Sequence, residues 1–198
     1  FGGNVTVSSV TVSGTHSSIA VHSGTLTVNE GIRSEYVTRN NVDFIGVLEL
    51  NLYGGVMTVN GGMELEYSTR AHVLNIYGGV LNVSSDSSYA ITGGSRYVRI
   101  NVLGGDLYAF GNGYALYSCD LNVLYGSAHL SSEGAYYAYA FYGNMAADNA
   151  KYYGDKSPSP ERSEDNLRNR DSFTWPEYVT VIGAGNAEGV EYIGDRKS

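Results

Sequence analysis

Short segments in which apolar and polar residues alternate recur along the first 143 residues of the chain. One set places two aliphatic residues around a small or polar one: Ile19-Ala20-Val21, Leu50-Asn51-Leu52, Leu74-Asn75-Ile76, Ile100-Asn101-Val102 and Leu121-Asn122-Val123. A period of two is typical of β-strands, because successive side chains of a strand point to opposite faces. Each segment is therefore predicted to be a short strand with one buried face.

A corner rich in glycine follows each of these strands, and a second alternating segment follows the corner. The corner most often reads Tyr-Gly-Gly, as in residues 53–55 and 77–79. Glycine adopts positive φ without a Cβ clash, which a sharp bend between strands requires. The second glycine of the corner recurs at intervals of 21, 31, 24, 26 and 21 residues: Gly3, Gly24, Gly55, Gly79, Gly105 and Gly126. These copies indicate an internal repeat.

The second segment of each repeat supplies another inward pair: Val5/Val7, Leu26/Val28, Met57/Val59, Leu81/Val83, Leu107/Ala109 and Ala128/Leu130. A third, less regular strand is predicted within residues 35–39, 66–70, 88–92, 113–118 and 136–141. Three strands per repeat, stacked like on like, predict an all-β fold: a three-sided parallel β-solenoid of about six coils that share one aliphatic core. The alternative is a sandwich of hairpins, which needs two-residue turns such as Asn60-Gly61 between its strands.

Two regions depart from the repeat. The 31-residue interval contains an insertion at about residues 37–47, which should leave one corner as a loop. The pattern stops after Gly143, so we assign residues 1–143 to the solenoid and 144–198 to a polar loop and a C-terminal capping strand of the same domain. The segment EYVTVIG (177–183) is the predicted strand, and a short helix is expected near 161–169. A cap is expected because solenoid ends expose unpaired strand edges.

Composition narrows the possible partners. The chain has 12 Lys and Arg against 20 Asp and Glu, a net charge of −8, and no Lys in its first 150 residues. Nucleic acids and anionic membranes need clustered basic side chains, so neither is an expected partner. There is no apolar run long enough to insert into a membrane. The single cysteine, Cys119, cannot form an internal disulfide and is predicted to be a small buried hydrophobe.

The beginning of the chain falls within a repeat. Phe1 stands where later copies have Tyr53 and Tyr77, and neither a starting methionine nor a signal peptide precedes it. We therefore expect a mature or trimmed piece of a longer protein that is flanked by further domains.

The acidic residues do not predict catalysis. β-Solenoids that cleave polysaccharides use clustered Asp or Glu. Glu49 and Asp120 belong to one outward column, but they would lie three coils or roughly 14 Å apart, whereas paired glycosidase carboxylates stay under about 10 Å. The best remaining acid-base cluster repeats within EYxTR: Glu35, Arg39, Glu66 and Arg70. A salt-bridge ladder is the more ordinary interpretation of that cluster, so we expect a protein that is not an enzyme.

Metal and cofactor binding are not predicted either. The four histidines, His16, His22, His72 and His129, lie far apart and none has a partner at the spacing of metal ligands. His22 occupies the corner position that Tyr53 and Tyr77 hold elsewhere, which favours packing over ligation. No cofactor is expected.

The repeat LNIYGGVLNVSSDSSYAITGG (residues 74–94) resembles the secreted bacterial β-solenoids described as carbohydrate-binding-domain proteins, within the pectate-lyase-like superfamily. The closing W-x-E-Y-V-T-V at residues 175–181 is similar to the end of such domains. The resemblance implies a right-handed parallel β-helix at the cell surface or outside the cell, with plant or host glycans as possible ligands. It matches no lyase base and no calcium cluster of that superfamily.

A glycan-binding site is predicted on the first strands and the corner that follows them. The candidates come from three consecutive coils: Tyr53, Asn75, Tyr77, Arg99 and Asn101. Amides suit sugar hydroxyls, tyrosine rings can stack on sugars, and a guanidinium can hold a sugar carboxylate in bidentate fashion. A competing site is the tyrosine-rich third strand around Tyr114, Tyr117, Tyr137 and Tyr139.

Three functions are compatible with the sequence. The first is a non-enzymatic extracellular recognition or adhesion module that binds a polysaccharide. The second is a structural spacer of a bacterial surface protein, because stacked amides of a solenoid can simply stabilise one another. The third is a polysaccharide lyase or hydrolase.

Overall fold

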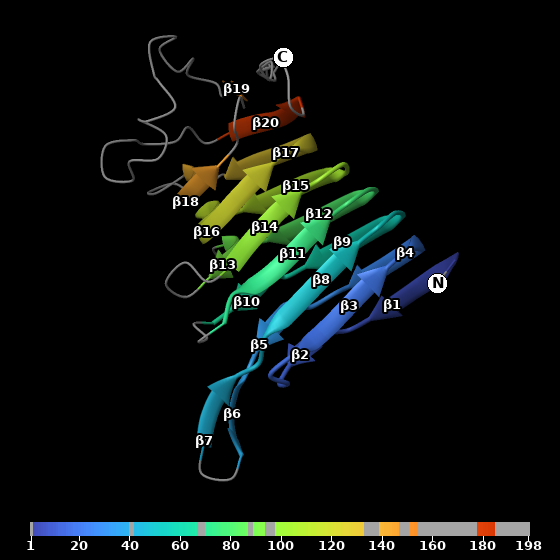
Figure 1. The fold of residues 1–198 in the computed structure, drawn as a ribbon, viewed down its shortest axis with the longest axis vertical. Helices are drawn as coiled ribbons and strands as arrows, with labels where there is room; N and C mark the ends of the chain where they lie inside the picture. The colour runs from blue at the N-terminus through green and yellow to red at the C-terminus, as the bar shows by residue number, and fades with distance from the viewer. Residues whose placement is uncertain are drawn as a thin grey trace.

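The chain folds as an all-β parallel solenoid of about five turns (Figure 1). The structure is a computed structural model, and it describes residues 2–39, 42–66, 70–86, 89–93, 98–132, 139–146, 151–153 and 178–184. No helix occurs within these ranges. Strands of successive coils pair in parallel, which confirms the predicted fold and is incompatible with a sandwich of hairpins.

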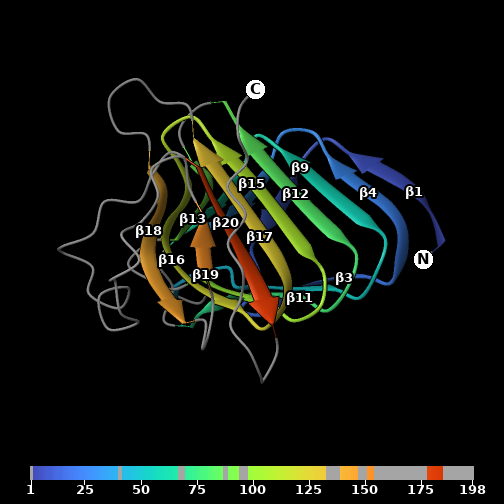
Figure 2. The same cartoon turned by 90° about the horizontal axis from the view of Figure 1, so that it is seen from above.

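The strands that follow the glycine corners form one sheet, which we call the second-strand face (Figure 2). Its parallel members are β1 (Gly2–Val7), β4 (Ser23–Val28), β9 (Val56–Asn60), β12 (Val80–Ser85), β15 (Asp106–Gly111) and β17 (Tyr125–Ser132). Two antiparallel strands extend it, β20 (Tyr178–Ala184) beside β17 and then β19 (Lys151–Tyr153). The predicted strand at 177–183 is thus confirmed, and it pairs with β17, the last parallel strand of this sheet.

The other two sides of the solenoid belong to one ten-stranded sheet. The first-strand face precedes the glycine corners and contains β3 (Ser17–Val21), β8 (Leu48–Leu52), β11 (His72–Ile76), β14 (Val98–Val102) and residues 119–123 of β16. The third-strand face contains β2 (Val10–Val12), β5 (Ile32–Ser34), β10 (Met63–Leu65), β13 (Tyr89–Gly93) and residues 114–117 of β16. The two faces join because β16 (Tyr114–Val123) runs through both, with a register shift at Ser118, whose φ is 57°. β18 (Tyr139–Ala146) pairs with β16.

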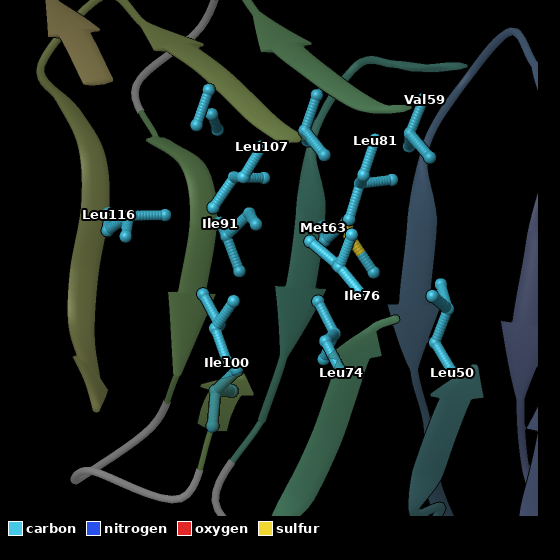
Figure 3. Close-up of a cluster of buried hydrophobic side chains, with 14 of the residues drawn as sticks. Leu50, Val59, Met63, Leu74, Ile76, Leu81, Ile91, Ile100, Leu107 and Leu116 are labelled. Carbon is cyan, nitrogen blue, oxygen red and sulfur yellow. The ribbon is translucent and has the colours of Figure 1, made fainter. Parts of the chain in front are cut away.

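The aliphatic residues predicted to face inward form a single core along the axis (Figure 3). The register aligns them coil by coil, so that Leu50, Leu74, Ile100 and Leu121 stack on the first-strand face. Leu81 pairs with Met57 on one side and Leu107 on the other, and all three are fully buried. Val5 is an exception: it belongs to the same column, yet 43 % of it is exposed, because no coil of the described chain lies beyond β1.

The glycine corners are required by the stacking of the coils. Gly55 and Gly79 have φ values of 79° and 76°, in the left-handed region that side chains disfavour. A Cβ placed on Gly55 would lie 2.3 Å from the carbonyl oxygen of Gly24 in the preceding coil, and one on Gly79 would lie 2.3 Å from the carbonyl oxygen of Gly55. The corners therefore stack backbone on backbone.

Several sequence predictions need correction. Residues 35–39 are not the third strand of their coil; β5 (Ile32–Ser34) takes that place. The insertion is not a loop but an antiparallel hairpin of β6 (Tyr36–Arg39) and β7 (Val42–Ile45), which projects from the solenoid (Figure 1). β-Branched and aromatic residues in both arms favour such pairing.

The third strand of the next coil also begins earlier than predicted. β10 ends at Leu65, directly before the segment 66–70, of which residues 67–69 lie outside the described part. The parallel pairing of β18 continues to Ala146, three residues beyond the predicted end of the repeat at Gly143. The helix expected near 161–169 lies outside the described residues.

Candidate functional site

The outward residues at the middle of the first-strand face form a ladder of side-chain amides. Asn75 Nδ2 donates to Asn51 Oδ1 at 2.9 Å, Asn101 Nδ2 donates to Asn75 Oδ1 at 2.8 Å, and Asn122 Nδ2 donates to Asn101 Oδ1 at 2.7 Å. The register places these residues in adjacent coils, where the strand spacing brings identical amides within hydrogen-bonding distance.

The ladder has a direction that a carboxylate sets. In the coil before Asn51 the same position is Ala20, which has no polar side chain. Asn51 Nδ2 donates instead to Glu49 Oε1 at 2.8 Å, two residues away on the same strand face. Because a carboxylate only accepts hydrogen bonds, every amide above it donates toward Glu49. Each inner amide uses one N–H and one acceptor site in the ladder, which leaves a second N–H and a second lone pair for another partner.

An aromatic column lies at the corner beside this ladder. The ring of Tyr53 stacks on His22, with centroids 4.7 Å apart, and on Tyr77, with centroids 5.0 Å apart. The rings are nearly parallel, at 8° and 5°. Tyr53 and Tyr77 are 47 % and 44 % exposed. Both faces of the Tyr53 ring are covered by its neighbours, so this ring offers its edge and hydroxyl to a ligand, not the open face that sugar stacking needs.

Arg99 completes the predicted site. It lies on β14 in register with Val73 and Asp120, two residues before Asn101 and on the same outward face. Its side chain is exposed, and in the described part of the chain its guanidinium makes no hydrogen bond or ion pair. The five predicted residues therefore lie along one strip, which we call the first-strand strip: Tyr53, Asn75, Tyr77, Arg99 and Asn101.

A second group of polar and aromatic side chains lies outward on the second-strand face, where no site was predicted. Tyr108 stacks on His129 with centroids 4.4 Å apart. A shallow hollow of about 300 Å³ lies beside this pair, lined among others by Asn82, Ser84 and Phe110. The alternation of β15 does predict that Tyr108 points outward, but the hollow depends on how neighbouring rings lean, which sequence does not determine.

A serine next to this hollow contacts an aspartate and a histidine, but in an arrangement unlike a nucleophilic triad. Ser127 Oγ donates to Asp106 Oδ1 at 2.6 Å and lies 2.9 Å from His129 Nε2. Since the one hydroxyl proton goes to the carboxylate, the imidazole must donate to Oγ. A histidine that donates in this way cannot take the serine proton as a general base.

The two carboxylates predicted in the outward column of the first-strand face lie apart from each other. Glu49 and Asp120 are three rungs apart, with Val73 and Arg99 between them. Arg33 Nε lies 3.3 Å from Glu64 Oε2 in the next coil, an exposed ion pair worth at most about 1 kcal/mol. The Arg70 guanidinium lies 2.7 Å from His16 Nε2, and the Arg39 side chain lies outside what the structure describes.

Two buried titratable side chains, His72 and Cys119, have structural roles. His72 Nδ1 accepts the Leu48 N–H at 3.1 Å, and its Nε2 lies 2.9 Å from the Glu66 carbonyl oxygen, to which it donates. Burial lowers the pKa of His72, although the Glu66 carbonyl opposes the effect. Cys119 is fully buried, as predicted, and burial raises the pKa of its thiol far above the ordinary value, which keeps it unreactive. Among the described residues no three His, Cys, Asp or Glu side chains gather as a metal site would need.

The competing site on the third-strand face is a cluster of tyrosine rings. Tyr89 stacks on Tyr117 at 4.7 Å and lies 5.8 Å from Tyr114, which meets Tyr117 edge to face. All three rings are half-buried. Tyr137 and the side chain of Tyr139 lie outside the described part.

The chain was compared with known proteins. No family model matches it, and neither the curated proteins nor the solved structures contain a match. The resemblance to secreted carbohydrate-binding solenoids therefore stays a prediction. None of the described segments forms a helix that could cross a membrane.

Proposed function

We propose that this chain is a non-enzymatic, extracellular recognition module that binds glycans along the first-strand strip. The observation that supports it most is the exposure of Tyr53, Tyr77 and Arg99 beside a ladder of half-buried amides. Phenol hydroxyls, amides and a guanidinium are the polar groups that bind sugar hydroxyls and carboxylates.

Equivalent binding groups recur along the first-strand strip, which favours a polymeric ligand over a single sugar. Asn75 and Asn101 present equivalent N–H and lone-pair groups in consecutive coils, one strand spacing apart. A polysaccharide that runs along the solenoid axis would meet the same groups again in each coil. The guanidinium of Arg99, which has no partner among the described residues, favours an acidic chain, because it can pair with a uronate carboxylate through two hydrogen bonds.

A structural spacer is the second candidate, and one observation favours it. The amides hydrogen-bond to one another, and the tyrosine rings stack on one another, so both columns stabilise the solenoid without any ligand. A polysaccharide lyase or hydrolase is the third candidate. The three-rung separation of Glu49 and Asp120 argues against it.

A glycan array with the isolated chain separates the first two functions. We expect binding to acidic polysaccharides above neutral ones, and a loss of at least tenfold in affinity for Tyr53→Ala/Tyr77→Ala and for Arg99→Gln. Tyr108→Ala is the matched control, since it removes an equally exposed tyrosine from the second-strand face.

The outcomes discriminate among the three candidates. No binding to any glycan would favour the spacer. Binding that survives the double mutant and falls with Tyr108→Ala would move the site to the second-strand face. Release of unsaturated sugars or new reducing ends from pectin-like polymers would overturn the proposal in favour of an enzyme.

A further inference from the structure

The outward aromatic rings of the two faces differ in whether a ring face is open. On the first-strand strip both faces of the Tyr53 ring are covered, one by His22 and the other by Tyr77. On the second-strand face Tyr108 is 44 % exposed and stacks on His129, with centroids 4.4 Å apart and planes 9° from parallel. No other ring of the described residues stacks on Tyr108. One face of this ring is therefore available to a ligand.

The open face of Tyr108 points toward the preceding coil. β15 lies between β12 and β17, and the register places Asn82 on one side of Tyr108 and His129 on the other (Figure 2). Since the imidazole covers the side toward β17, the uncovered side lies over β12. Asparagine is shorter than tyrosine, so the outer part of the Tyr108 ring projects beyond Asn82. The same step recurs at Phe110, which is in register with Ser84, and the hollow of about 300 Å³ is lined by all four of these residues.

A chain of hydrogen bonds holds the imidazole that covers the other face of Tyr108. Ser127 Oγ donates to Asp106 Oδ1 at 2.6 Å, and His129 Nε2 donates to Ser127 Oγ at 2.9 Å. The imidazole is thus held at its edge by a hydrogen bond and at its face by the Tyr108 ring. A ring that is ordered before the ligand arrives loses less side-chain entropy on binding.

The lining of the hollow suits a neutral ligand that carries hydroxyl groups. The described residues that line it include no Asp, Glu, Lys or Arg. The amide of Asn82 and the hydroxyls of Tyr108 and Ser131 have no hydrogen bond to described residues, so they can bind a ligand without losing a contact. Asp106 is on the same outward face as Tyr108, two residues earlier on β15, and its carboxylate would repel an acidic ligand.

We propose that this hollow is a second carbohydrate site, which binds one neutral pyranose ring of the glucose type on the open face of Tyr108. A pyranose with equatorial hydroxyls has apolar C–H faces and a polar edge, which matches an aromatic face beside an amide and two hydroxyls. A volume of about 300 Å³ lies at the small end of ligand pockets, so the hollow holds one ring and not a chain. The site is on a different face from the first-strand strip and does not depend on it.

The probe is methyl β-glucopyranoside, titrated into the whole chain and followed by saturation-transfer NMR. We expect saturation to pass from aromatic protons of the protein to the ring C–H protons of the sugar. The dissociation constant should be on the order of millimolar, because a ligand of this size makes few contacts. Sorbitol is the matched control ligand, since it carries hydroxyl groups on a similar carbon chain but has no closed ring to stack, and it should not bind measurably.

Three substitutions at two residues locate the sugar. Tyr108→Ala should lower the affinity at least about tenfold, because it removes the stacking face. Tyr108→Phe keeps that face and loses one hydroxyl, so it should lower the affinity only about threefold. Asn82→Tyr places a ring against the open face of Tyr108, as Tyr77 does at Tyr53, so it should extend the aromatic column and abolish binding. Circular dichroism and the melting temperature check the fold of each variant.

Several results would overturn the proposal of this second site. These are no saturation transfer to the glucoside, equal binding of sorbitol, or an affinity that both Tyr108→Ala and Asn82→Tyr retain. If Tyr108→Ala fails to fold, Asn82→Tyr decides by itself. The double variant Tyr53→Ala/Tyr77→Ala should keep its affinity for the glucoside, and a loss there would place the sugar on the first-strand strip instead. A chain that binds the glucoside at Tyr108 but no acidic polysaccharide would contradict the function proposed for the strip and leave this site in place.

Discussion

The inward and outward columns of the first-strand face come from the same strands, yet their residues vary to different degrees. Inside, Leu50, Leu74, Ile100 and Leu121 interchange leucine and isoleucine without any gap in the core. Outside, the same strands carry four identical residues, Asn51, Asn75, Asn101 and Asn122, joined by hydrogen bonds of 2.7–2.9 Å.

The difference follows from the forces in each column. Burial of apolar surface has no direction, so residues of similar volume replace one another at little cost. A hydrogen-bonded ladder needs a donor and an acceptor at the same height in every coil, so one type of residue must recur. The aliphatic core therefore drives the coils to stack. The amide ladder favours the register in which each asparagine lies next to the asparagine of the neighbouring coil.

A charge in the inward column should prevent folding. Leu81 is fully buried between Met57 and Leu107, so Leu81→Asp would bury a carboxylate without a partner. We expect loss of the β-sheet signal in circular dichroism at 25 °C. The control is Asn82→Asp, which places the same charge one residue later on the outward face and should fold. A folded Leu81→Asp protein would contradict the inward assignment.

A methyl group on a glycine corner that stacks on the next coil should destabilise the fold nearly as much as a buried charge. Gly55→Ala places Cβ 2.3 Å from the Gly24 carbonyl oxygen at a φ of 79°, so we expect a loss of at least about 2 kcal/mol in unfolding free energy. Gly3→Ala is the matched control, because no atom lies within 4 Å of its Cβ. Urea denaturation measures both, and equal losses would show that corner stacking is not the cause.

Breaking the ladder should have a moderate effect. Asn75→Ala removes two hydrogen bonds and leaves Asn51 Oδ1 and Asn101 Nδ2 without their partners, which should cost about 1–3 kcal/mol. Among the described residues Asn122 donates only to Asn101, so Asn122→Ala removes one hydrogen bond and should cost less. Asn82→Ala is the control on the second-strand face, where this half-buried amide has no hydrogen bond to described residues, and should stay within about 0.5 kcal/mol. An Asn75 effect no larger than that of Asn82 would assign the ladder no role in stability.

The smallest effect should appear as a dependence on pH. His72 is neutral in the fold, since its Nδ1 accepts the Leu48 N–H and burial lowers its pKa below 6.5. Between that lowered pKa and 6.5 the unfolded chain binds the proton and the folded chain does not. Stability should therefore fall as pH drops below 6.5, by at most about 1.4 kcal/mol per pH unit from this residue. His72→Gln should be less stable at pH 7.5 and show a shallower slope, measured by denaturation from pH 7.5 to 5. An unchanged slope would assign the dependence to other groups.

Much of the architecture was predictable from local periodicity. Alternation identified the inward residues of two faces, and the glycine spacing aligned their coils correctly, from Gly24 through Gly126. The third-strand face was predicted less well, because its segments 35–39 and 66–70 alternate poorly and lie next to insertions. Antiparallel pairing within 36–45 competes with stacking there, and only the whole chain decides between the two.

Local pattern was enough to identify the residues that form the coil, because the period of apolar residues and the need for glycine at a bend are properties of short segments. How side chains outside the core contact one another depends on the folded arrangement of the coils. That arrangement joined Arg70 to His16, 54 residues away, directed the amide ladder toward Glu49, and turned Tyr53 and Tyr77 face to face. These contacts depend on rotamers and on the lateral position of one coil above the next, which an alternating pattern does not specify.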